Sequence, residues 1–239
     1  MDDDVPQLKL FSMHKSQIAK AISNAKPGLR TVWMGLASKI NCKLSGEIAI
    51  LESRPAIRIV DFGSFETIPF GKFPRGKFQL AFPYVQYFVH DNGCWDTNNF
   101  HQNGLLFLSF RNSPLPEFLG LNKMSKETIW FPPIPNVYDD HCVCLGSRDV
   151  VERKGNVSMD EFSKKVVKRF WLSSFFNING WPSQILIKDT SFRSFDNWKE
   201  MTKNFGLSVL SEVRWPGKQK ITNIFSCLQE PKKWQRPSY

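Results

Sequence analysis

The chain has 239 residues, a length that suits one domain with extensions or two small domains. Hydrophobic residues make up 41% of it and aromatic residues 14%, which allows a packed core and argues against wholesale disorder. The formal net charge is +10 and the sequence pI is about 9.4. This charge favours acidic partners, nucleic acid among them, but charge alone does not single one out.

The first residues, MDDDVPQ, lack the basic and apolar regions of a signal peptide. No apolar run approaches the roughly 18 residues that a membrane span needs. These features predict a cytoplasmic protein, in which the cysteines are expected to be reduced thiols. Their number is odd, which fits no complete disulfide framework. They are Cys42, Cys94, Cys142, Cys144 and Cys227.

The N-terminal third changes its hydrophobic period. Residues 14–25 place apolar side chains at helical spacing, and Lys26-Pro27-Gly28 ends this predicted helix. Residues 31–40 are ambiguous. From Gly46 to Phe110 short apolar segments, bounded by Gly, Pro, Asn or Asp, predict one mainly antiparallel β-meander. The segments are GEIAIL, AIRIVDF, KFQLAF, YVQYFV and GLLFLSF.

Two helices are predicted after the meander. Ser158 and Glu161 form a capping box in front of residues 159–175, whose apolar stripe of Phe162, Val166 and Phe170 should pack on the sheet. A second helix is predicted over 195–204, with Trp198, Met201 and Phe205 on one face. A basic tail follows Val213, and its cations are expected to face solvent. The tail itself is expected to be a solvated or docked extension, or a nucleic-acid contact with interleaved aromatic residues. Its members are Arg214, Lys218, Lys220, Lys232, Lys233 and Arg236, with Trp215, Trp234 and Tyr239.

This order of elements predicts an α+β fold, an antiparallel β-meander with flanking helices segregated to one end or face of the sheet. Three parts are expected along the chain. Residues 1–40 form an N-terminal helical segment and 41–178 an α+β core. Residues 179–239 form a C-terminal helical and basic extension.

The segment 131–146, FPPIPNVYDDHCVCLG, places two cysteines after a proline-rich loop. A metal site, a nucleophile and a plain core cysteine are all open interpretations, the last being the simplest for Cys42 and Cys227. The sequence gives only weak support for a zinc site, because it lacks the C-x2-C spacing that structural zinc sites usually have. The residues that a metal site would draw on are His90, Cys94, His101, His141, Cys142 and Cys144.

The same string resembles the active-site signature of ubiquitin-conjugating enzymes, in which a His-Pro-Asn tripeptide precedes the ubiquitin-carrying cysteine by eight residues. Asn136 and Cys144 stand at that spacing, and the flanks NVY and VCL match. PNVYDDHCVCLGS is similar to bacterial relatives of that fold, such as the plasmid-borne PRTRC system protein B family. The motif covers 131–147 and the order of elements about 40–175. Two positions depart from the pattern: Ile134 replaces the histidine, and His141 stands where a glycine is usual.

The resemblance implies a ubiquitin-conjugating-like core and an activity. Cys144 would carry a ubiquitin-like protein as a thioester and pass it to an amine, and Asn136 would stabilise the oxyanion or shape the loop. His141, with Asp139 and Asp140, would help to deprotonate the amine; turn formation is the competing role. The implied partners are an adenylating, ubiquitin-activating-like enzyme and a ubiquitin-like protein, with no cofactor.

One alternative stays open beside this activity. A conjugating-like fold that has lost the chemistry would act as a binding subunit of a plasmid, phage or defence complex. Its basic surface could then contact nucleic acid.

Overall fold

A computed structural model of the chain describes residues 28–40, 46–62, 76–91, 105–115, 127–137, 143, 153, 155–173, 187 and 189–221. The helix predicted over 14–25 and all five cysteines lie outside these residues. No helix within the described ranges is long and apolar enough to cross a membrane. The elements are β1 (Leu29–Leu36), η1 (Ala37–Ile40), β2 (Glu47–Ser53), β3 (Ala56–Phe62), β4 (Gly76–Phe82), β5 (Tyr84–His90), β6 (Leu105–Arg111), β7 (Thr128–Ile129), α3 (Met159–Leu172), α5 (Phe195–Phe205), η2 (Gly206–Glu212) and β8 (Gln219–Lys220).

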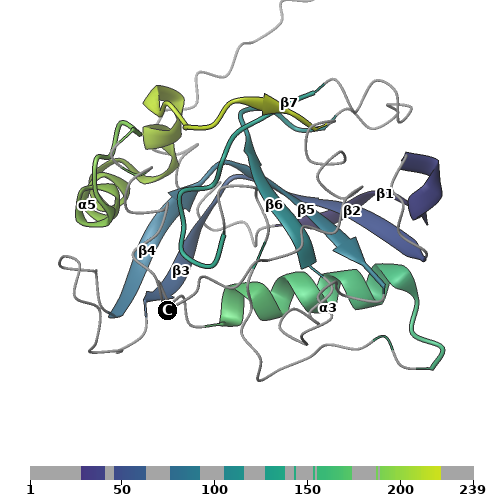
Figure 1. The fold of residues 1–239 in the computed structure, drawn as a ribbon. Coiled ribbons are helices and arrows are strands. Elements are labelled where there is room, and N and C mark those ends of the chain that lie inside the picture. The colour runs from purple at the N-terminus through teal and green to yellow at the C-terminus, as the bar shows by residue number, and fades with distance from the viewer. Residues whose placement is uncertain are drawn as a thin grey trace, which may run out of the picture.

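The strands pair antiparallel throughout. One sheet has the order β1-β2-β5-β6, β3 pairs with β4, and β7 pairs with β8 (Figure 1). Since β2 runs almost directly into β3, and β4 into β5, these four strands are the two arms of one long hairpin. The chain therefore follows the predicted meander, and with its helices it has the expected α+β fold.

The structure differs from the sequence-based expectation in two places. Residues 29–36 lie at the end of the N-terminal segment expected to be helical, mostly in the stretch whose pattern is ambiguous, and they form strand β1, which pairs with β2. The meander is also not one sheet. The register of the long hairpin is the same on both sides of the break: Ser53 pairs with Val85, and Ala56 pairs with Phe82. Pro55 therefore stands opposite Pro83. Neither proline has an N–H to donate, so the ladder of hydrogen bonds breaks there.

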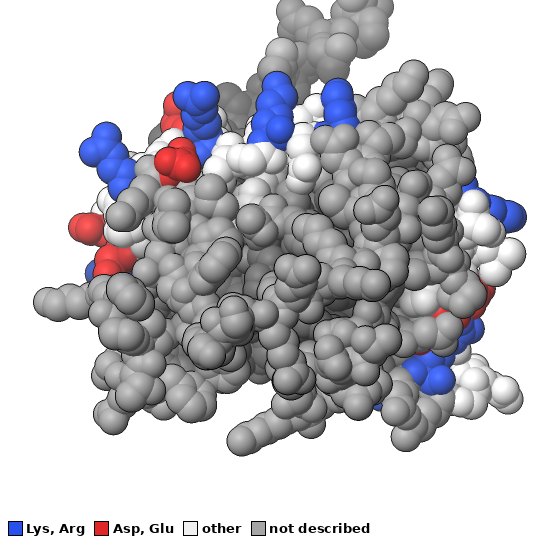
Figure 2. All heavy atoms as spheres, in the orientation of Figure 1, with Lys and Arg blue, Asp and Glu red and all other residues white. Residues whose placement is uncertain are grey.

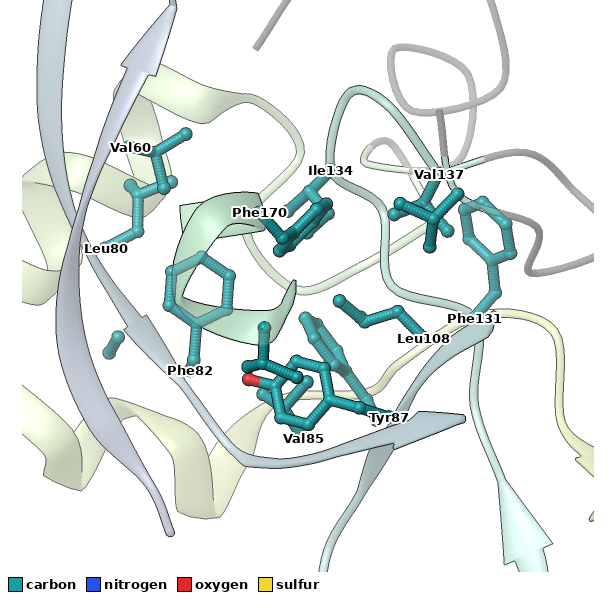
Figure 3. Packing of buried hydrophobic residues seen from close by; sticks show 14 of the residues in the cluster. Val60, Leu80, Phe82, Val85, Tyr87, Leu108, Phe131, Ile134, Val137 and Phe170 are labelled. Carbon is teal, nitrogen blue, oxygen red and sulfur yellow. The ribbon is translucent and has the colours of Figure 1, made fainter. Parts of the chain in front are cut away.

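Helix α3 packs on the sheet as its sequence predicts. Ser158 caps it, with its Oγ accepting from the Glu161 N–H at 3.2 Å, and Phe162, Val166 and Phe170 are buried. The helix ends at Leu172, three residues before the predicted end. Figure 3 shows side chains from four strands, α3 and the proline-rich loop meeting in one cluster. This shared core joins the sheet to the loop that carries the predicted site.

Helix α5 covers the edge of β4 that β3 leaves open. The Thr202 hydroxyl accepts from the Ala81 N–H at 3.0 Å, and the Trp198 indole N–H donates to the Ala81 carbonyl at 3.0 Å. These side chains take the place of a further strand, so the edge groups are not left unpaired in the interior. The buried face consists of Phe195, Trp198 and Thr202, whereas Phe205, expected to share a face with Trp198, is exposed.

The described part of the C-terminal extension packs in the same core. Trp215, one of the aromatic residues interleaved in the basic tail, is 4% exposed, and its ring centroid lies 4.8 Å from that of Phe110 and 5.5 Å from that of Trp198. Its interpretation as a base-stacking residue is therefore wrong. The described tail cations Arg214, Lys218 and Lys220 are exposed as predicted. Trp234, Tyr239, Lys232, Lys233 and Arg236 lie outside the described residues.

The face of the four-stranded sheet opposite α3 carries a row of polar residues. Arg30, Glu52, Gln86 and Ser109 stand opposite one another, one on each strand. Glu52 accepts from the Arg30 guanidinium at 3.0 Å and from the Leu115 N–H at 2.7 Å. Gln86 is fully buried, and within the described part of the chain neither of its amide atoms has a hydrogen-bond partner. A buried unsatisfied amide costs about 1–3 kcal/mol.

We therefore expect Gln86→Met, which keeps the length of the side chain, to raise the free energy of unfolding by about 1 kcal/mol or more. Chemical denaturation followed by circular dichroism measures it. Gln79→Met, on the exposed face of β4, is the matched control and should change stability by less than about 0.5 kcal/mol. A destabilised Gln86→Met would show that the amide is hydrogen-bonded in solution.

The first turn of α3 is tied to β1 through Asp160. Lys164 donates to this carboxylate at 2.7 Å, and the Thr31 hydroxyl also donates to it. These two hydrogen bonds, that of Lys164 first, lower the pKa of Asp160 from its ordinary value of 3.8. Because the folded pKa lies below the unfolded one, the carboxylate stabilises the fold above 3.8, and this contribution is lost as the pH falls through the folded pKa.

Asp160→Asn should lower the free energy of unfolding at neutral pH by less than about 1 kcal/mol, since the side chain is 36% exposed and solvent screens the pair. The difference from wild type should shrink as the pH falls well below 3.8. Urea unfolding across this range tests both statements. Glu161→Gln, one residue on, controls for the loss of a charge in the first helical turn. A difference that does not depend on pH would contradict the assignment.

Candidate functional site

The proline-rich loop leaves the sheet directly beside β6. Trp130 exchanges two backbone hydrogen bonds of 2.9 Å with Phe110, and the Phe131 N–H then donates to the Pro216 carbonyl at 2.9 Å. Phe131 itself is 2% exposed within the core. The loop therefore starts from a fixed point between β6 and the C-terminal segment.

The loop is buried although it is irregular. A buried loop must satisfy its backbone N–H groups, and prolines 132, 133 and 135 have none. Within residues 132–135 one backbone N–H is left, that of Ile134, and it donates to the Pro132 carbonyl at 2.7 Å. Ile134, at the position of the histidine in the resembled motif, is fully buried in the hydrophobic core. Its side chain thus anchors the loop by apolar packing.

Asn136 has a left-handed backbone conformation, with φ at 65°, and is partly exposed. Asn is one of the few residues other than Gly that adopt this conformation readily. The turn geometry alone therefore accounts for an Asn here. A role of its side-chain amide in catalysis is compatible with this geometry but is not required by it.

A bridge between Val137 and Val143 closes the loop. The two residues pair antiparallel, and each is 4% exposed within the core. Residues 138–142 connect them. In the sequence, Asn136 directly precedes Val137 and Cys144 directly follows Val143. The bridge therefore pairs the two residues that lie just inside the Asn136–Cys144 interval.

The structure places only part of the predicted site. Asn136 is described, whereas Cys144, His141, Asp139 and Asp140 lie outside the described residues. Of the residues considered for zinc, His90 is described; it ends β5, is buried, and has its Nε2 3.7 Å from an Asp91 carboxylate oxygen. Within the described ranges no group of three or more His, Cys, Asp or Glu residues could hold a metal ion.

Arg153 has a positioning role that the sequence analysis missed. In the sequence, Arg153 lies between the predicted nucleophile, Cys144, and the start of α3 at Met159. Its Nε donates to the Val157 carbonyl at 2.9 Å, and its Nη1 pairs with Glu47 and lies 3.7 Å from Asp91. These contacts attach the approach to α3 to the end of the β2–β5 pair. A lone Arg in a charged stretch carries no local signal, because its partners are distant in sequence.

No protein-family model, curated protein or solved structure matches the chain. The interpretation of the site therefore depends on the loop geometry and on the motif.

The backbone at Asn136 leads to a stability prediction. Asn136→Ala should lower the free energy of unfolding by about 1 kcal/mol relative to Asn136→Gly, because Gly tolerates a φ of 65° and Ala does not. Thermal and urea unfolding of both variants measure the difference. Asn204, exposed in α5, is the control. There Ala should be more stable than Gly, as in any helix. Equal stability of the two Asn136 variants would mean that the turn does not constrain this residue.

Proposed function

We propose that the protein is a ubiquitin-conjugating-like carrier that holds a ubiquitin-like modifier as a thioester on Cys144 and transfers it to an amine. The observation that carries the proposal is the Val137–Val143 bridge. The bridge pairs the residue that follows Asn136 in the sequence with the residue that precedes Cys144. The antiparallel meander, followed by this loop and then α3, supports it.

The proposed reaction has two transfers. The Cys144 thiolate attacks the thioester of the activating enzyme, so a new C–S bond forms while the old one breaks and releases that enzyme's thiol. An acceptor amine then attacks the Cys144 thioester, an amide bond forms, and the Cys144 thiolate leaves. A negative charge develops on the carbonyl oxygen in each step. The Asn136 side-chain NH2 is the donor assigned to that oxygen.

The residues between the two valines have supporting roles in this proposal. His141, with Asp139 and Asp140, accepts the proton that the attacking amine loses. The partners are an adenylating enzyme, a ubiquitin-like protein and an amine-bearing target. The chemistry requires a reduced thiol, which is consistent with the cytoplasmic location that we propose.

A catalytically inactive form of the same fold is the second candidate. It is favoured by Asn136, whose identity the left-handed turn explains without any chemistry. Ile134, in place of the motif's histidine, fits this candidate as well as the first. In this case the protein is a binding subunit of a larger plasmid, phage or defence complex.

Thiol reactivity separates the two candidates without any partner. In the carrier, Cys144 should be alkylated by iodoacetamide in the folded protein well before Cys142, because transfer requires an accessible thiolate. Mass spectrometry of digested protein reads each site. Preferential labelling of Cys142 with Cys144 protected would refute the assignment. Equal protection of both cysteines would favour the binding-only form.

Transfer itself is tested with an adenylating, ubiquitin-activating-like enzyme and a ubiquitin-like protein, the two partners that the proposal requires. A reductant-sensitive adduct on a non-reducing gel should form with wild type and with Cys142→Ser, and should be lost with Cys144→Ser. Asn136→Gly keeps the turn and removes the donor, so it should slow transfer by about 10²–10³-fold. Normal transfer by Asn136→Gly would leave this residue a turn residue only.

A further inference from the structure

Residues 213–221, which we call the cationic strap, cross the chain at the start of the proline-rich loop. The Pro216 carbonyl accepts from the Phe131 N–H at 2.9 Å, and the Ile221 N–H donates to the Glu127 carbonyl at 3.2 Å. Gly217, with φ at 63°, lies so close that a Cβ there would be 2.8 Å from the Phe131 Cβ. The strap is therefore held against β7 and the loop along much of its length.

The strap presents its cations outward from a buried base. Val213, Trp215 and Ile221 are buried, whereas its three basic residues are exposed. These are Arg214, Lys218 and Lys220. Figure 2 shows basic side chains, with acidic ones beside some of them, projecting along the upper edge of the molecule, where Figure 1 draws β7 and the yellow C-terminal segment. Because the base is fixed in the core, little ordering is needed when a partner contacts these side chains.

One exposed carboxylate, Glu212, directly precedes the strap, whose three cations outnumber it. No Asp or Glu occurs within 213–221. Glu127, beside the strand that pairs with the strap, accepts from the buried Arg111 guanidinium at 3.0 Å. The exposed Arg193 extends the basic surface, since its turn is joined to the strap by a 3.2 Å hydrogen bond from the Arg214 N–H to the Ser191 hydroxyl.

We propose that the cationic strap binds the phosphodiester backbone of nucleic acid without reading its sequence. Phosphate contacts need only projecting cations, and a net charge of +10 attracts a polyanion over long range. A protein-binding surface is instead built around exposed aromatic or aliphatic residues. The strap has none facing outward, because its one aromatic residue, Trp215, is buried. The surface therefore fits a uniform chain of phosphates better than an acidic protein.

This inference does not depend on the chemistry of Cys144. It does give the bound nucleic acid a position, since the strap bonds to Phe131, five residues before Asn136 in the chain. The bound strand would lie on the side of the molecule from which the proline-rich loop departs. Amine-bearing proteins on the same nucleic acid would then be brought near the proposed carrier site.

Fluorescence anisotropy with the full chain tests the proposal, using a mixed-sequence DNA duplex and a single strand of RNA of equal length. The test variant is Arg214→Gln, Lys218→Gln and Lys220→Gln combined. The control is Lys165→Gln, Lys168→Gln and Lys203→Gln combined, which removes the same charge from exposed positions of α3 and α5. Circular dichroism and thermal melting verify that both variants fold.

Wild type should bind at low salt, and its affinity should fall as salt rises from about 50 to 200 mM. The strap variant should flatten the slope of log K against log salt by about 2–3 on duplex DNA, at about 0.9 per lost phosphate contact, or by about 2 on the single strand. The control should keep the wild-type slope. A preference for either nucleic acid identifies the source of the phosphates.

Three results would overturn the proposal. The first is that wild type fails to bind either nucleic acid at about 50 mM salt, where phosphate contacts are strongest. The second is an equal loss of affinity in the two variants, which would show that overall charge and not the strap is responsible. The third is competition by polyglutamate of matched charge that is as strong as competition by DNA, which would identify an acidic protein as the partner.

Discussion

The position of Pro55 opposite Pro83 determines how the rest of the fold is arranged. Each proline lacks an N–H, and the unbroken register sets both at the same point of the long hairpin. The hairpin therefore divides into a part that lies within the four-stranded sheet and a part, β3 and β4, whose strands pair only with each other among the described residues. The first part provides the surface for α3. The second leaves an edge of β4 that α5 covers through its two hydrogen bonds to Ala81.

The division also creates the space that the aromatic side chains fill. Trp198 stacks on Phe192 with ring centroids 4.9 Å apart, and Trp215 completes the group beside Phe110. Such rings each bury a large apolar area, and their edge-to-face and stacked contacts add about 0.5–1.5 kcal/mol per pair. The C-terminal segment is therefore held in the core, which fixes the point to which the proline-rich loop attaches.

Local signals were enough to predict α3, because the Ser158 cap and an apolar stripe of period 3.6 are both encoded within one stretch. The α+β class and the antiparallel strands between Gly46 and Phe110 followed in the same way. Features set by distant partners could not be predicted. Pro55 and Pro83 are each visible in the sequence, but that they oppose one another depends on register. Trp215 lies among cations, and only packing against Phe110 and Trp198 shows that it is buried.

At the candidate site, too, the sequence alone leaves the role of one residue undecided. Asn136 is favoured by a left-handed turn and is equally the donor that an oxyanion would need, so its identity alone does not distinguish structure from chemistry. What the structure adds is the reason for a turn at this point. Ile134 and Val137 are both buried on the core side, and Val137 must reach Val143. A left-handed residue between them reverses the chain without removing either side chain from the core. The loop can therefore keep its shape with or without the thioester reaction, and for this reason the decisive property is the accessibility of Cys144 and not the geometry of the turn.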